Sequence, residues 1–311
     1  MKKCKICSLA IILILSISNS SVAQEIKLLK TTRFPHYPSA STIAIYNNRI
    51  YIIGDDAPYM LIVDTNHKVL DSTRLFSSTT KRINKEEKAD IESSFLSNKS
   101  NNTYLVALSS FSTRKRNKYI VFNLTQKGKK AKIKNQRSLF AGGISEWNIE
   151  GATWIDRYLI MSNRANLSHK INHLLIVDFH LRRGIRQKKI KVIPITFPQE
   201  QAVTGISGLT YVEKTDVLLF TASTEKTLNS YDDGEIGESF LGIIENGSAK
   251  ITGENIKPDT LLNLSKLFGN KSLQKIESIA VESDKEKYMI IHLAADNDNG
   301  ESTLFKIQLK K

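Results

Sequence analysis

Four short stretches of the sequence share one pattern, in which an apolar, a polar and a small residue precede a run of apolar residues, and Ser39-Ala40-Ser41 is a weaker fifth copy. The polar residue of each stretch is Ser41, Glu92, Glu150, Ser207 or Glu277. A second set of polar residues follows the next apolar run and includes Asp55, Asp56, Asn163, Arg164, Asp296 and Asp298. Carboxylate and amide oxygens are the ligands that Ca²⁺ prefers. A guanidinium such as that of Arg164 can bind a carboxylate or an anionic ligand through two parallel hydrogen bonds.

The segments that must position these residues are typical of β-strands. Most apolar runs are five to eight residues long, rich in Ile, Val, Leu, Tyr and Phe, and bounded by turn residues, as in "RIYIIG", "RYLIMSN" and "KYMIIHLAA". The chain is therefore predicted to be all-β. One helix is expected at Asp259–Gly269, where an Asp that can act as N-cap precedes leucines at helical spacing and a closing Gly.

The polar motif recurs through the chain at long intervals. Counted from Ala40, the centre of the weaker first copy, to the polar positions 92, 150, 207 and 277, the steps are 52, 58, 57 and 70 residues. A second hairpin usually follows the first within each unit. Four antiparallel strands repeated radially describe a β-propeller. Five blades are favoured, and six are possible if the first or fourth unit hides another. The last unit has three clear strands, so the N-terminal run Glu25–Lys30 is expected to supply its fourth strand and close the ring.

A propeller would bring the polar residues together. The first strand of each blade lines the central channel, and its start lies beside the end of the second strand because the two form an antiparallel hairpin. All five pairs would then meet at one mouth of the channel, with the loop Ser230–Ser239 as a lid. Such a ring is expected to bind a small ligand or Ca²⁺. The residues expected to bind a ligand are Glu92, Glu150, Asn163, Arg164, Ser207 and Glu277, and those expected to bind a metal ion are Asp55, Asp56, Asp296 and Asp298. The structural alternative is that these side chains bond the backbone of neighbouring blades.

The N-terminus has the pattern of a bacterial signal peptide. Lysines precede an apolar core, and Ser21-Val22-Ala23 is a small-x-small cleavage signal. Residues 1–23 are therefore predicted to be a signal peptide and residues 24–311 one β-propeller domain, exported to the periplasm or secreted. The apolar run is too short for a transmembrane segment. Both cysteines lie in this leader, so the expected mature chain has neither a disulfide nor a thiolate nucleophile.

The formal net charge of +14 is concentrated in two windows, 114–137 and 181–191, which contain Lys and Arg but no acid. Solvated outer strands are the favoured interpretation, and docking to an anionic surface is the alternative. A nucleic-acid partner is not expected for an exported protein. We expect a monomer.

The stretches "NIEGATW", "GISGLTYV" and "IESIAV", with the strand ends "SNR" and "DNDNG", resemble the phytase-like (esterase-like) extracytoplasmic β-propellers and their uncharacterised bacterial relatives. In that group an Ile/Leu-Glu-Gly motif opens the inner strands. Glu92, Glu150 and Glu277 match its acid, whereas Ser207 departs from it and the first unit lacks it. The resemblance implies a propeller fold and phosphoester hydrolysis.

Three functions follow from the sequence. The first is an exported propeller that binds a small ligand or Ca²⁺ at the mouth. The second is a metal-assisted phosphoesterase, in which Glu150 or Glu277 would orient metal and water and Arg164 would hold the phosphate. The third is a non-catalytic scaffold that uses the basic outer strands. The motifs alone assign no enzyme activity.

Overall fold

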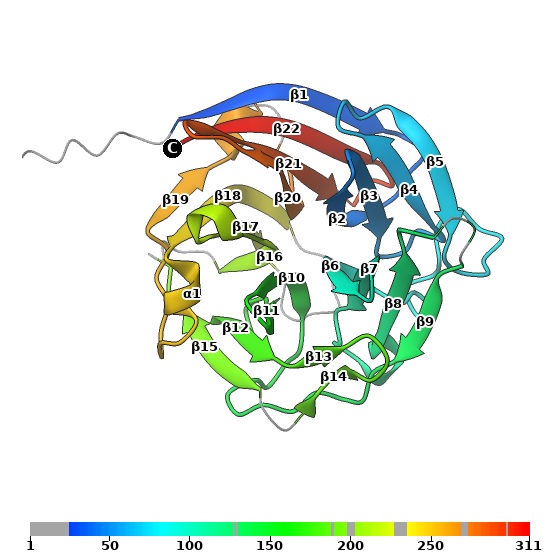
Figure 1. The fold of residues 1–311 in the computed structure, drawn as a ribbon, viewed down its shortest axis with the longest axis horizontal. Helices are drawn as coiled ribbons and strands as arrows, with labels where there is room; N and C mark the ends of the chain where they lie inside the picture. Colours follow the sequence, from blue (N-terminus) through cyan, green and yellow to red (C-terminus); the bar gives the residue numbers. More distant parts are fainter. Residues whose placement is uncertain are drawn as a thin grey trace, which may run out of the picture.

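The computed structural model describes residues 25–126, 128, 130–187, 190–197, 203–226, 235–268, 273–296 and 298–311. Five four-stranded antiparallel sheets are arranged as blades around a central channel (Figure 1). The predicted all-β propeller with five blades is therefore confirmed. The predicted signal peptide lies outside the described residues.

Each blade uses four strands in order from the channel outward. Blade 1 contains β2 (Ala40–Tyr46), β3 (Arg49–Gly54), β4 (Tyr59–Asp64) and β5 (Val69–Arg74). Blade 2 contains β6 (Ile91–Lys99), β7 (Asn102–Ser109), β8 (Lys118–Asn123) and β9 (Lys132–Asn135). Blade 3 contains β10 (Ile149–Ile155), β11 (Tyr158–Asn163), β12 (Asn172–Val177) and β15 (Lys191–Ile195). Blade 4 contains β16 (Thr204–Val212), β17 (Val217–Lys226), β18 (Glu235–Glu245) and β19 (Thr260–Asn263).

Blade 5 closes the ring with both ends of the chain. It contains β20 (Ile276–Asp284), β21 (Tyr288–Asp296), β22 (Ser302–Lys310) and, outermost, the N-terminal strand β1 (Ile26–Phe34). In Figure 1 the blue strand β1 lies along the red strand β22. This confirms the predicted closure, and β1 extends four residues beyond the expected run because its pairing with β22 continues to Phe34 and Ser302.

The helix predicted at Asp259–Gly269 is wrong for the residues that the structure describes. Thr260–Asn263 is strand β19, which pairs with β18, and Ser265–Leu267 is a single 3₁₀ turn. Blade 4 needs an outermost strand, and pairing with β18 outweighs the helical spacing of the leucines. Short additions complete the fold, namely the hairpin β13 (Phe179–His180) and β14 (Gly184–Ile185), the one-turn helix α1 (Gly247–Lys250), and 3₁₀ turns at Arg114–Arg116 and Glu213–Thr215.

The polar residue of the sequence motif occupies a β-bulge in every blade. The register between the first and second strands skips one residue between Ala40 and Thr42, and equivalent skips occur in the other four blades. The skipped residues are Ser41, Glu92, Glu150, Ser207 and Glu277. A bulge leaves its extra residue out of the ladder and changes the direction of its side chain. The repeat therefore extends to the backbone geometry at the mouth.

The small residue after the bulge leaves space for the next blade. A Cβ atom on Gly151 would lie 2.7 Å from Cβ of Leu209 in blade 4. A Cβ atom on Gly208 would lie 2.9 Å from Cα of Ser278 in blade 5. Both distances are below what van der Waals contact allows, so a larger residue here would push neighbouring blades apart.

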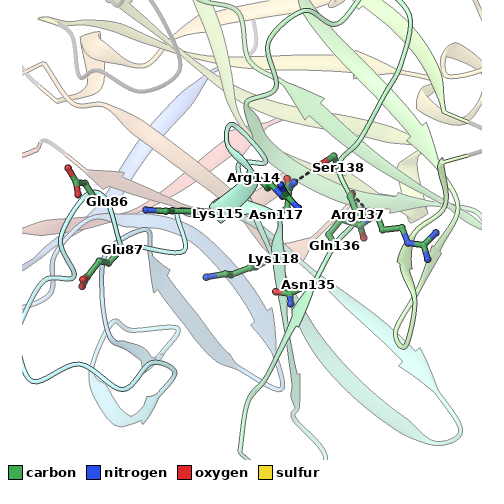
Figure 2. A pocket seen from close by; sticks show the side chains of 10 residues that line it. All are labelled: Glu86, Glu87, Arg114, Lys115, Asn117, Lys118, Asn135, Gln136, Arg137 and Ser138. Carbon is green, nitrogen blue, oxygen red and sulfur yellow. Dashed lines mark hydrogen bonds between the residues drawn. The ribbon is translucent and has the colours of Figure 1, made fainter.

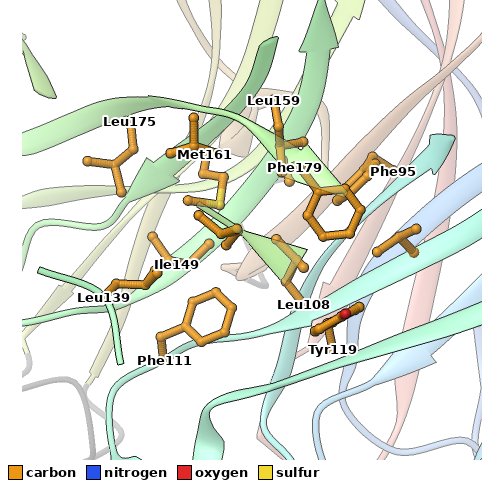
Figure 3. Close-up of a cluster of buried hydrophobic side chains, with 14 of the residues drawn as sticks. Phe95, Leu108, Phe111, Tyr119, Leu139, Ile149, Leu159, Met161, Leu175 and Phe179 are labelled. Atoms are coloured by element: carbon orange, nitrogen blue, oxygen red, sulfur yellow. The ribbon is translucent and has the colours of Figure 1, made fainter. Parts of the chain in front are cut away.

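Hydrophobic side chains fill the space between adjacent blades. The cluster between blades 2 and 3 is shown in Figure 3, where Phe95, Leu108 and Tyr119 pack against Ile149, Met161 and Phe179. Burying one such side chain contributes about 1.5–3 kcal/mol. These interfaces fix the five inner strands around the channel and so fix the side chains at its mouth.

Candidate functional site

The start of each inner strand lies beside the end of its hairpin partner at the mouth. The backbone N–H of Asp55 donates to Ser39 O at 3.2 Å, and that of Arg164 donates to Asn148 O at 2.9 Å. Ser110 and Asp296 donate equivalently to Asp90 and Lys275. These bonds bring the two sets of polar side chains to the same end of the channel.

Two of the five bulged residues are used within the fold. The Ser41 hydroxyl donates to Ser39 O at 2.9 Å and accepts the Asp55 N–H. The Ser207 hydroxyl donates to Ile276 O in blade 5 and lies 3.1 Å from the Thr221 hydroxyl. Ser207 thus bonds the backbone of a neighbouring blade, as the structural alternative expects, whereas Ser41 bonds the backbone of its own blade. The other three bulges, in blades 2, 3 and 5, carry glutamates.

One group of charges, which we call the Arg164 cluster, joins blades 3, 4 and 5. It consists of Glu150, Arg164, Glu225, Lys275 and Glu277. Arg164 donates to Glu225 at 2.7 Å and lies 3.6 Å from Glu150 and 3.7 Å from Glu277. Lys275 lies 3.2 Å from Glu277 and 3.6 Å from Glu225. Two cations are thus enclosed by three carboxylates.

Burial decides the protonation of this cluster. Burial raises the pKa of Glu150 to about 8, although the Arg164 guanidinium opposes the shift, and Glu277 adds to it. Burial alone would lower the pKa of Arg164, but Glu150 and Glu225 outweigh it and raise that pKa. Glu150 also accepts a hydrogen bond from the Asn148 amide at 2.8 Å. Arg164 therefore stays charged, and Glu150 titrates near neutral pH.

Blade 4 is shaped to receive Arg164. A Cβ atom on Gly205 would lie 2.5 Å from Cγ and 2.6 Å from Nε of Arg164. Gly205 stands two residues before Ser207, at the position that Asn148 holds before Glu150. Blade 4, which has Ser207 in place of the motif's glutamate, is thus the blade against which the Arg164 side chain packs.

A second group of charges, which we call the Glu92 cluster, lies between blades 1 and 2. It consists of Asp55, Lys88, Asp90, Glu92 and Arg116. Carboxylate oxygens of Asp55, Asp90 and Glu92 all lie within 4.8 Å of one another. Lys88 forms ion pairs with Asp55 and, at 3.0 Å, with Asp90, while Arg116 binds Asp90 at 2.8 Å.

The Glu92 cluster keeps unsatisfied acceptors. No hydrogen bond or ion pair joins the Glu92 carboxylate to any residue that the structure describes. Oδ1 of Asp55 is buried, and within the same described ranges it accepts no hydrogen bond. Burial and then Glu150 raise the pKa of Glu92 well above its usual value, and burial raises that of Asp55 to about 6 despite Lys88.

The remaining predicted residues have separate partners. Asp56 forms an ion pair with Arg82 at 2.6 Å, and Asp298 lies 3.8 Å from Lys275. Asp296 accepts the Asp298 N–H, and burial together with Asp55 raises its pKa to about 8. The Asn163 amide bonds the backbone of Asn148 and Glu146, so it holds the loop before β10. Of the four aspartates predicted as metal ligands, Asp55 is the one that belongs to the carboxylate group found within 4.8 Å among the described residues.

Sequence reasoning missed several residues of the mouth. Asp90 and Lys275 stand two residues before Glu92 and Glu277, so extending the motif to include that position would have found them. Lys88 lies in an irregular segment and Arg116 in the 3₁₀ turn Arg114–Arg116. Arg116 belongs to a window interpreted as solvated, although it is only 4% exposed. Residues 230–234 of the predicted lid loop lie outside the described residues.

The rest of that basic window borders a groove of about 750 Å³ beside blade 2. Lys115 and Lys118 point across it toward the loop of Glu86 and Glu87 (Figure 2). Arg114 and Arg137 also line the groove. The surface is therefore of mixed charge.

Within the described ranges, no helix has the length and apolarity needed to cross a membrane. Together, the fold and the channel mouth define the class of protein: a single five-bladed β-propeller with carboxylates gathered at one end of its channel. The chain belongs to the family of unknown function DUF6929, whose model matches residues 36–309. The β-propeller fold implied by the phytase-like resemblance is confirmed, whereas phytase-like activity stays a prediction.

No curated protein sequence matches the chain. Several solved structures are distantly similar to it. The glutaminyl cyclase of Myxococcus xanthus is 8% identical, covers 92% of this chain and 96% of its own, and has a TM-score of 0.46. The GH43 endo-arabinanase of Bacillus licheniformis is 13% identical, with coverage of 87% and 93% and a TM-score of 0.46. The β-propeller domain of Cps50 (Swd1) from Myceliophteria thermophila is 13% identical, with coverage of 90% and 99% and a TM-score of 0.40.

Proposed function

We propose that this protein is an exported β-propeller that binds Ca²⁺ at the Glu92 cluster. The observation that supports this is the convergence of Asp55, Asp90 and Glu92 within 4.8 Å. Oδ1 of Asp55 makes no hydrogen bond in the described part of the chain. Ca²⁺ takes six to eight oxygen ligands. Three carboxylates would leave positions that face the channel, where water or a small oxygen-bearing ligand can bind.

The electrostatics favour a cation over an anion. Burial raises the pKa of Glu92 well above its usual range and that of Asp55 to about 6, so both carboxylates hold protons more tightly than exposed ones do. A bound divalent cation would displace those protons, since carboxylates ligate metal when deprotonated. Lys88 is the competing cation, and Ca²⁺ binding requires its ammonium to move away from Asp55.

Calorimetric titration of CaCl₂ into chelator-treated protein tests the proposal. We expect one site, with proton release visible as a dependence of the heat on the ionisation enthalpy of the buffer. Glu92→Gln should weaken binding at least tenfold, whereas Glu254→Gln, at an exposed residue, should not change it. Absence of heat and of a thermal shift, or equal affinity in the Glu92 variant, would remove the cation site.

Export rests on the leader sequence. The lysines, the apolar core and the Ser21-Val22-Ala23 signal predict cleavage after residue 23. N-terminal sequencing of the protein recovered from periplasmic and culture fractions should begin at Gln24. A full-length chain confined to the cytoplasm would contradict this.

Metal-assisted phosphoester hydrolysis is the second candidate. The pKa of about 8 for Glu150 favours it, because such a carboxyl can exchange a proton near neutral pH. The surroundings of Arg164 oppose it, since three glutamates around the guanidinium repel a phosphate. A panel of phosphomonoesters and diesters with added Ca²⁺ decides, and wild-type turnover by Glu150→Ala would exclude this site.

The interaction scaffold is the third candidate. The groove of Figure 2 supports it, because Arg114, Lys115, Lys118 and Arg137 all line that surface. Binding to vesicles rich in anionic lipid should then weaken as salt rises from 50 to 500 mM. Binding that ignores salt would contradict an electrostatic surface.

A further inference from the structure

The channel contains a cavity of about 410 Å³ beyond the charged mouth. Its walls come from all five inner strands, and each strand contributes the second, third and fourth residues after its bulge. The cavity is therefore the lumen of the propeller itself. Its volume falls within the range of about 300–1,000 Å³ that is usual for small-molecule sites.

The fourth residue after each bulge is large and apolar in every blade. These residues are Ile45, Leu96, Trp154, Tyr211 and Val281, and we call them the collar. Each is half-buried, although nearby residues of the same strands, such as Ile43, Leu209 and Ile279, are almost completely buried. Exposed apolar surface gathered in a concave space is typical of a ligand site.

Two hydroxyl groups in the cavity wall bond neighbouring blades. The Thr153 hydroxyl accepts the Tyr211 N–H at 3.1 Å, and the Ser94 hydroxyl lies 2.7 Å from that of Thr42. Glu213 is the charged residue of the lining, so the field in the cavity is negative. An anionic ligand is therefore disfavoured.

The collar also has flat surfaces. Trp154 and Tyr211 belong to adjacent blades that meet at the Thr153 hydrogen bond. The Trp154 ring is held edge-to-face against Phe95, with centroids 5.6 Å apart and planes at 88°. Aromatic side chains favour aromatic partners and, through their faces, cations. We propose that the channel binds a small neutral or cationic aromatic molecule, with its ring in the collar.

The first experiment titrates the neutral fluorophore N-phenyl-1-naphthylamine into the protein and follows directly excited probe emission. We expect enhanced emission that saturates at one probe per chain. Val281→Trp fills the lumen from blade 5 and should weaken binding at least tenfold. Val69→Trp makes the same change on the outermost strand β5, where Val69 is 53% exposed, and should not affect binding.

Leu96→Trp, which fills the lumen from blade 2, gives a second variant should Val281→Trp fail to fold.

A competition experiment then tests which ligand charge the cavity prefers. Benzyltrimethylammonium should displace the probe at concentrations at which benzenesulfonate does not. The proposal is overturned if no saturable binding occurs, if both filled variants that fold bind as wild type, or if the sulfonate competes equally well. Ca²⁺ titration is independent of these results, since it reports the mouth.

Discussion

The two ends of the channel are built from the same five strands but differ in chemistry. At the mouth, Arg164 and Lys275 lie beside the bulged Glu277, and Lys88 pairs with Asp90 next to the bulged Glu92. Four residues further along each strand, the collar is apolar and its walls are uncharged except for Glu213. The bulge separates these two environments, since it breaks the regular alternation of side chains along the strand. One repeat can thus carry two binding surfaces, one governed by charge and one by apolar contact.

The largest effect should come from removing the central cation of the mouth. Arg164→Met leaves Glu150, Glu225 and Glu277 buried with Lys275 alone, so we expect the free energy of unfolding to fall by about 3–5 kcal/mol. Arg157→Met, at an exposed arginine stacked on Tyr158, should change it by less than about 0.5 kcal/mol. Urea unfolding measures both. Equal losses would mean that the mouth is no more dependent on charge than the surface.

A smaller effect should follow from pH. The folded-state pKa of Glu150 is about 8 and lies above its unfolded value, so its stabilising contribution is present at acid pH and is lost as pH rises through 8. Between pH 5 and pH 8 the folded state binds more protons than the unfolded state, so the metal-free protein should lose on the order of a few kcal/mol of stability through such groups. Glu150→Gln should reduce this slope. An unchanged slope in that variant would assign the effect to other groups, such as Asp296.

The smallest effect is expected at the collar. Leu96 is half-buried and faces the lumen, so Leu96→Thr should cost about 1 kcal/mol or less and leave the pH profile unchanged. Leu105→Ala, at a fully buried position of the same blade, should cost about 2–5 kcal/mol. Thermal and urea unfolding compare the two. A collar loss as large as the core loss would show that the lumen is packed rather than open.

The sequence predicts the blade count and the convergence of polar residues because both follow from a repeat that recurs five times. It does not reveal that the motif residue is a bulge, since register depends on the partner strand. Asp90 and Lys275 escape notice because their role arises only when Glu92 and Glu277 lie beside them. The collar cannot be recognised either, because Leu96 and Val281 resemble any apolar strand residue. Their exposure depends on the channel width that five blades set.

At Asp259–Gly269 the error is of the other kind, because the local pattern predicts a helix that does not form. Its leucines have helical spacing, and only the need of β18 for a partner makes Thr260–Asn263 a strand. Similarly, Asp56 forms an ion pair with Arg82, which lies in the irregular segment between β5 and β6. Long-range pairing decides both cases, and local pattern carries no information about it.

The pairing of β1 with β22 has a consequence for how the molecule forms. Ile26 lies opposite Leu309, so β1, the first strand to be synthesised, cannot pair with β22 until almost the whole chain has been made. Contacts between such distant segments slow folding. Until β1 docks, β22 exposes a row of unpaired backbone groups that can accept the first strand of another chain. Ring closure therefore depends on concentration. In a dilute solution β1 pairs with β22 of its own chain, whereas among crowded nascent chains it can pair with β22 of another molecule.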